Sequence, residues 1–192
     1  MRAKQRREWI RFVGCAATAA MCATAAFGAH ADDSFMLTSP SLTVGGTMPA
    51  VNVLNDNGCS GGNQSPPLEW HNAPPGTGGF AVSVYDPDAP GRGFWHWSVF
   101  GIPATTHSLP ANASASGAIT ALGALQARND YGNDGYGGPC PPPGRPHRYV
   151  ISVHALKNIR SSLQDGRPAA VFAHEIDALE IAKASLTVTY GH

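Results

Sequence analysis

The sequence predicts a mostly β domain with a single substantial helix at its periphery. Four segments are rich in alternating, β-branched or aromatic residues, which is typical of strands: 80–86, 94–102, 148–156 and 184–192. The 22 glycines and 16 prolines gather in turn-rich stretches between these runs, which favours a loop-rich β fold over a helical bundle. The 192 residues suffice for one domain with a sizeable core.

The predicted helix covers residues 168–184. Its apolar positions Val171, Phe172, Ile176 and Leu179 recur near helical spacing. A shorter apolar stretch, 116–127, has no clear preference for helix or strand. Since strands outnumber helices, the helix is expected to pack on the outside of a β domain.

Residues 1–31 are expected to be a signal peptide that is removed. A basic start is followed by a small, apolar run of about 18 residues, and Ala29-His30-Ala31 fits an A-x-A cleavage site. A single membrane anchor is the alternative at this length, but the run is alanine-rich and weakly hydrophobic. Arg6-Arg7 leaves both general and twin-arginine export open. We therefore expect one domain over residues 32–192, located in the periplasm or secreted.

The charge of residues 32–192 argues against a nucleic-acid partner. Residues 1–31 carry five of the 13 Lys/Arg and one of the 13 Asp/Glu, so the remainder has 8 basic and 12 acidic side chains, a net charge of −4. Binding to a phosphate backbone needs clustered basic residues, and no such stripe is present in the sequence.

Two cysteines, Cys59 and Cys140, remain beyond the predicted signal peptide. An even pair in an exported chain indicates a disulfide. Two free thiols or half of a metal site are the alternatives. No CxxC or His-x-x-x-His spacing accompanies the pair, so no metal is expected.

The stretch YDPDAPGRGFWHW concentrates polar and aromatic residues between two predicted strands. The prolines stiffen the loop that carries Asp86 and Asp88, although aspartates in such a place can simply build their own turn. On the following strand, alternation predicts that Trp95 and Trp97 face one side and His96 the other. His96 could then approach the aspartates, or be a lone surface histidine.

A second constellation is YGGPCPPPGRPHRY, residues 136–149. Gly137 and Gly138 permit close backbone approach, and His147 and Tyr149 share one strand face at positions i and i+2. Backbone N–H groups, an imidazole and a phenol would suit an oxyanion pocket. The alternative is a surface loop pinned by Cys140, with the tyrosine in the core.

Together with GGNQSPPLEW and RNDYG, these motifs resemble the phosphatidylethanolamine-binding protein family, and more narrowly its bacterial Raf-kinase-inhibitor-like branch. The resemblance runs from Phe35 to Tyr190. It implies a Greek-key β-sandwich of two antiparallel sheets with few helices. It also implies a small pocket that takes phosphate, acetate or a phospholipid headgroup.

Carried over to this sequence, the resemblance implies a pocket made of Asp86, Asp88, Trp95, His96, Gly138, Pro139, His147 and Tyr149. It suggests a cis peptide at Ala89-Pro90. The chain ends without the extended C-terminal helix of animal members, so gating by that helix is not expected. The Cys59–Cys140 disulfide fits exported bacterial relatives.

The leading functional prediction is an exported protein that binds a small anion, such as phosphate or a phosphoethanolamine headgroup, without a cofactor and without catalysis. The two aspartates would orient and protonate His96 and His147 as donors. One alternative is a protein-interaction module that inhibits a protease or kinase. Another is a hydrolase that uses the Asp and His side chains.

Overall fold

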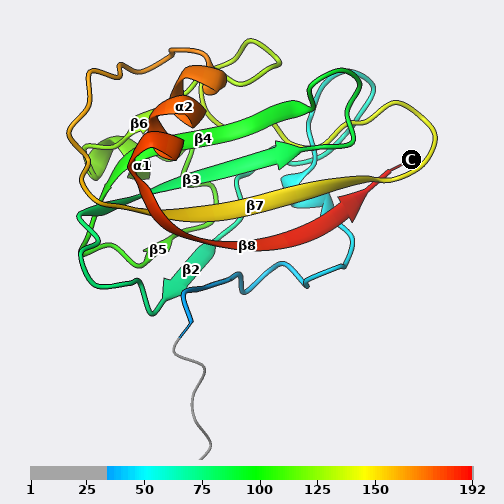
Figure 1. The fold of residues 1–192 in the computed structure, drawn as a ribbon. Coiled ribbons are helices and arrows are strands. Elements are labelled where there is room, and N and C mark those ends of the chain that lie inside the picture. The colour runs from blue at the N-terminus through cyan, green and yellow to red at the C-terminus, as the bar shows by residue number, and fades with distance from the viewer. Residues whose placement is uncertain (1–33, 192) are drawn as a thin grey trace, which may run out of the picture. The chain divides into compact units, whose positions relative to one another are not determined.

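The computed structural model describes residues 34–191. The predicted signal peptide and its cleavage site lie outside the described residues. Two antiparallel sheets and two α-helices make up the described domain (Figure 1). This confirms the predicted mostly β fold class.

The larger sheet has five strands in the order β6-β4-β3-β7-β8. Its strands are β3 (Gly79–Asp86), β4 (Phe94–Pro103), β6 (Leu125–Gln126), β7 (His147–Leu156) and β8 (Glu180–Tyr190). The smaller sheet has the order β1-β2-β5, with β1 (Met36–Thr38), β2 (Leu68–His71) and β5 (Ser108–Leu109). The four predicted strands correspond to β3, β4, β7 and β8, which form the continuous centre and one edge of the larger sheet.

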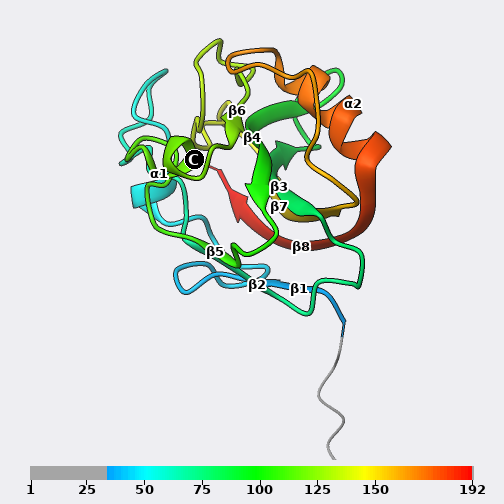
Figure 2. The ribbon, with the colours of Figure 1, turned by 90° about the vertical axis from the view of Figure 1, so that its left-hand side faces the viewer.

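The main core lies between the two sheets. Trp70 of β2 packs edge-on against Phe80 of β3 at a ring-centroid distance of 5.4 Å, and both side chains are fully buried. The opposite face of the five-stranded sheet carries a second, smaller core beneath α2 (Ala169–Leu179), where Phe172 and Ile176 pack with Phe100 of β4. Figure 2 shows α2 on one side of the larger sheet and the smaller sheet on the other.

The predicted helix over 168–184 is shorter than expected. It ends at Leu179, and Glu180 already begins β8. From Ile181 onward, exposed and less exposed residues alternate, and pairing with β7 outweighs the helical spacing of the preceding residues. The ambiguous stretch 116–127 divides between a one-turn helix, α1 (Ala118–Ala121), and β6.

Within residues 34–191, no helix has the length and apolar character needed to cross a membrane. A further short element is the 3₁₀ turn η1 (Ala50–Asn52), which lies in the long connection between β1 and β2.

A β-bulge at His96 changes the faces predicted for β4. Val84 of β3 pairs with Trp97, but the next residue, Tyr85, pairs with Trp95, so His96 is an extra residue in β4. Trp97 therefore packs in the core between the sheets, whereas Trp95 packs against the core under α2. The expectation that the two tryptophans share one face is wrong, because it assumed unbroken alternation.

Candidate ligand-binding site

A cavity of about 130 Å³ lies where β3 ends and where β4 and β7 begin. The side chains of its floor are buried, whereas Pro90 and Pro142 at its rim are exposed. Its lining consists of Asp86, Ala89, Pro90, Phe94, His96, Tyr131, Cys140, Pro141, Pro142, His147 and Tyr149. Four of these, Asp86, His96, His147 and Tyr149, were predicted site residues.

Asp86 holds His147 at the bottom of the cavity. Nδ1 of His147 donates to Oδ2 of Asp86 over 2.7 Å, and both side chains are nearly inaccessible. The other carboxylate oxygen, Oδ1, accepts the backbone N–H groups of Asp88 and Ala89. Asp86 therefore builds its own turn and also lines the cavity. With Nδ1 committed as a donor, Nε2 of His147 is the nitrogen left for a ligand.

His96 is fixed by a backbone carbonyl and not by a carboxylate. Its Nδ1 donates to the carbonyl oxygen of Gly137 over 2.7 Å. The rings of Phe94, Tyr131 and Tyr149 surround it at centroid distances of 5.0, 5.6 and 5.1 Å. This burial lowers the pKa of His96, since a charged imidazole would lose its hydration. The prediction that aspartates orient both histidines thus applies to His147 only.

Tyr149 brings an unpaired hydroxyl to the cavity. The side chain is fully buried, and its Oη has no hydrogen-bond partner within the described residues. Tyr131, which also contacts the His96 ring, donates from its hydroxyl to the Gly138 carbonyl over 3.1 Å. Burial, and then the charge of Asp86, raise the pKa of Tyr131 to about 12, and the same two causes raise the pKa of Tyr149. Both phenols therefore keep their protons at neutral pH.

The GGPC segment supports the cavity wall from behind, with its glycine N–H groups already in use. The N–H of Gly137 donates to the carbonyl of His96, and the N–H of Gly138 donates to the side-chain Oδ1 of Asn63. A Cβ on Gly138 would lie 2.3 Å from the carbonyl oxygen of Asn52, so only glycine fits there. The expectation that these N–H groups line an oxyanion pocket is therefore wrong.

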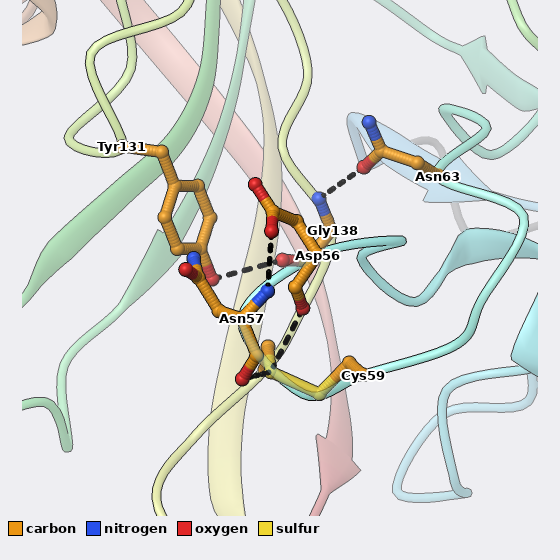
Figure 3. The surroundings of a disulfide bond; sticks show 7 residues. Asp56, Asn57, Cys59, Asn63, Tyr131 and Gly138 are labelled. Atoms are coloured by element: carbon orange, nitrogen blue, oxygen red, sulfur yellow. Dashed lines mark hydrogen bonds between the residues drawn. A yellow bond between two sulfur atoms is a disulfide. The ribbon is translucent and has the colours of Figure 1, made fainter.

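The predicted disulfide between Cys59 and Cys140 is present, with a Cα–Cα distance of 6.0 Å. It ties the cavity wall to the loop around Asp56 and Asn57, as Figure 3 shows, close to Gly138 and its bond to Asn63. Cys140 itself lines the cavity. The disulfide thus stiffens the part of the wall formed by Cys140, Pro141 and Pro142.

Four predicted site residues do not line the cavity. Asp88 points to Arg148 and accepts three hydrogen bonds of 2.9 Å from the backbone N–H and the guanidinium group of Arg148. These bonds hold the pKa of Asp88 far below its usual range. Trp95 packs against Tyr85 with tilted rings, on the other face of the sheet. Gly138 and Pro139 act through their backbones, and the Pro139 carbonyl accepts the N–H of Leu54.

Phe94 and Tyr131 line the cavity and were not among the predicted site residues. Tyr131 belongs to RNDYG, a motif that contributed to the family resemblance but was given no role. Phe94 lies on the cavity side of β4, where Trp95 was expected. The extra residue at His96 exchanges the faces of the residues that precede it in β4. The Ala89-Pro90 peptide bond is trans, since no cis peptide occurs in the described chain, so the predicted cis bond is wrong.

No cluster of three or more His, Cys, Asp or Glu side chains in the described part of the chain has the geometry to hold a metal ion. The polar side chains at the cavity are two imidazoles, two phenols and one buried carboxylate, which is bonded to His147.

The sequence and the fold both have well-defined relatives. The family model for phosphatidylethanolamine-binding protein matches residues 38–191. YbcL of Escherichia coli is 43% identical over 160 residues, which is 82% of this chain and 87% of the relative. YbhB of Escherichia coli is 40% identical over 81% of this chain and 99% of the relative.

Solved structures give the same result. The crystal structure of Escherichia coli YbcL, described as a member of the mammalian PEBP family, superposes with a TM-score of 0.79 at 42% identity and covers 82% of this chain and 98% of that one. CT736 from Chlamydia trachomatis has a TM-score of 0.69 at 28% identity and covers 83% and 99%. The chain therefore belongs to the phosphatidylethanolamine-binding protein family.

Proposed function

We propose that the cavity binds a small oxyanion, such as phosphate or the phosphate of an ethanolamine headgroup, without transforming it. The observation that carries this proposal is the unpaired hydroxyl of Tyr149 in the same cavity as the fixed imidazole of His147. A buried hydroxyl without a partner costs about 1–3 kcal/mol. An acceptor oxygen bound in the cavity would remove that cost.

The hydrogen-bonding groups of the cavity favour a ligand that accepts hydrogen bonds. Asp86 already receives two backbone N–H groups and the His147 imidazole, so its negative charge is compensated within the protein. The bond to Asp86 occupies Nδ1 of His147 and fixes the ring, so Nε2 is the nitrogen that remains available to a ligand. The raised pKa values of Tyr131 and Tyr149 keep both phenols protonated.

The size of the cavity limits the ligand to a headgroup. At about 130 Å³ it is well below the roughly 300–1,000 Å³ of pockets that take drug-sized ligands. A phosphate or acetate group is in keeping with this volume, and a lipid acyl chain would remain outside. The Cys59–Cys140 disulfide supports a location outside the cytoplasm, where such bonds persist.

Calorimetric titration of the purified, oxidised protein with phosphate, phosphoethanolamine and acetate tests this proposal. We expect saturable binding of at least one of these anions, and its loss in His147→Ala and in His96→Ala. His174→Ala is the matched control, because His174 is exposed on α2 and does not line the cavity. Unchanged titrations in both cavity variants would exclude the site, as would no binding of any anion by the folded protein.

A further inference from the structure

A chain of hydrogen bonds joins Ser83, His154 and Glu180 on the face of the larger sheet that lies away from the cavity. Nε2 of His154 lies 2.8 Å from Oγ of Ser83, and Nδ1 of His154 lies 2.6 Å from Oε2 of Glu180. The serine comes from β3, the histidine from β7 and the glutamate from the junction of α2 and β8. β3, β7 and β8 are neighbouring strands of the larger sheet (Figure 1). Ala81 and Leu156, each two residues from Ser83 or His154, pack in the core under α2, so alternation places the serine and the histidine on that face.

The protonation pattern of this cluster follows from its partners. A carboxylate only accepts, so Nδ1 of His154 carries the proton that is shared with Glu180. Neutral His154 then has its lone pair on Nε2, and the Ser83 hydroxyl donates to it. Ionised Glu180 is stabilised there, because the hydrogen bond from His154 lowers the pKa of its carboxyl group. A hydroxyl, an imidazole and a carboxylate in this order and tautomer form the arrangement that activates a serine nucleophile.

A further hydroxyl lies next to Ser83. In the strand register, Ser83 is directly opposite Ser98 of β4 and Ser152 of β7. Ser152 is bonded to Ser185 over 2.8 Å. Ser98 is fully buried, and its hydroxyl has no hydrogen-bond partner in the described part of the chain. An unpaired donor beside an activated hydroxyl could receive a developing oxyanion.

We propose that Ser83, His154 and Glu180 form a second, nucleophilic site that hydrolyses small activated esters. The Ser83 Oγ attacks the carbonyl carbon, its proton passes to His154 Nε2, and the carbonyl oxygen becomes an oxyanion that accepts from Ser98. When this intermediate collapses, the bond to the leaving alcohol breaks and the alcohol takes the proton from His154. Water then repeats the sequence on the acyl-serine, releasing the carboxylic acid and restoring the Ser83 hydroxyl.

The surroundings of Ser83 restrict the substrate and the rate. Its exposed fraction is only 5%, so a small, reactive acyl group is required. On the same face, the contacting rings of Tyr85 and Trp95 provide apolar surface beside it. The backbone N–H groups of β3 belong to the sheet ladder, so the Ser98 hydroxyl is the oxyanion donor that remains there. One oxyanion donor contributes about 10²–10³ in rate, and we expect slow turnover.

Covalent labelling with a fluorophosphonate probe tests the nucleophile, and turnover of p-nitrophenyl acetate tests the reaction. We expect one adduct per chain, located by mass spectrometry on Ser83 and absent in Ser83→Ala. Labelling should slow at least a hundredfold in His154→Ala and at least tenfold in Glu180→Gln. Ser152→Ala is the matched control, because Ser152 faces Ser83 from β7 but is bonded to Ser185 and not to the histidine.

Two results would overturn the proposal: a folded protein without an adduct on Ser83, or labelling that is equally fast in His154→Ala. Folding of each variant is checked by its unfolding transition and by anion titration of the cavity. The cavity shares none of its lining residues with this cluster. Loss of esterase activity with intact anion binding, or the reverse, therefore distinguishes failure of one proposal from failure of the other.

Discussion

The same strand presents a histidine–carboxylate pair on each of its faces. At the start of β7, Nδ1 of His147 meets Asp86 over 2.7 Å on the cavity side. Seven residues later, Nδ1 of His154 meets Glu180 over 2.6 Å on the side of α2. Because seven is an odd number, alternation places the two histidines on opposite faces. The two pairs differ in the second ring nitrogen, which faces the cavity in His147 and a serine hydroxyl in His154.

The same histidine–carboxylate pair can therefore serve two different kinds of chemistry. A carboxylate on Nδ1 fixes the ring and its tautomer, and whatever lies beyond Nε2 decides the chemistry. A cavity with an unpaired phenol favours binding of an anion from solution. A serine within hydrogen-bond distance favours proton transfer from that serine. The walls differ as well, since the cavity depends on loops and the outer cluster depends on paired strands.

The largest effect should come from removing the disulfide that supports the cavity wall. In the double variant Cys59→Ala/Cys140→Ala, we expect the free energy of unfolding to fall by about 4 kcal/mol, because a loop closed over 81 residues regains its freedom in the unfolded chain. Chemical denaturation measures this change. Anion affinity should fall too, because Cys140 lines the cavity.

The outer cluster provides the internal control for that experiment. Ser83 and His154 lie on paired strands and do not line the cavity whose wall includes Cys140, so labelling of Ser83 under native conditions should keep its rate. Equal losses of anion affinity and of labelling rate would show that the two faces do not differ in their dependence on the loops.

Strands and disulfide could be predicted from the sequence because their signals are local or compositional. The runs 80–86, 94–102 and 148–156 lie within one residue of β3, β4 and β7. The smaller sheet was not predicted strand by strand, because its strands have only two to four residues and show no usable alternation. The helix end was missed, because pairing between β7 and β8 is a long-range contact that spacing does not encode.

The cavity could be predicted only in part, because alternation along a strand is a local signal whereas the pairing of distant residues is not. His147 and Tyr149 share a face by simple alternation, and both line the cavity. The side chain of Asp88 was assigned to the pocket, although it pairs with Arg148. That pairing joins residues 60 positions apart in sequence. The bulge that exchanges Phe94 for Trp95 also has no signal in the sequence alone.

The two aspartates of DPDAP offer a sharper test of what holds His147. We expect Asp86→Asn to weaken sulfate binding ten- to a hundredfold, because an amide in place of the carboxylate no longer holds the His147 imidazole in its tautomer and orientation. Asp88→Asn removes the same charge two residues away, where it faces Arg148 outside the cavity lining. Calorimetry should give this control a sulfate affinity within about twofold of the unaltered protein. Equal losses in both variants would mean that the loop, and not the His147 pair, governs binding.

The smallest expected effect is the response of anion binding to pH. Burial lowers the pKa of His96 below its ordinary value of 6.5, so free protein holds this imidazole neutral at pH 7. A bound anion favours the charged form, in which Nε2 becomes a donor, so binding takes up a proton. As pH falls from 7 to 6, the affinity for sulfate should therefore rise, by about threefold. Sulfate is chosen because its charge is constant in this range.

The same lowered pKa predicts a loss of stability on acidification without ligand. The unfolded chain binds a proton at its histidine near pH 6.5, whereas the folded protein binds it only at lower pH, so the free energy of unfolding falls as pH decreases below 6.5. Sulfate should offset part of this loss. A free energy of unfolding that does not fall on acidification in the absence of sulfate would contradict a buried, neutral His96 in the folded protein.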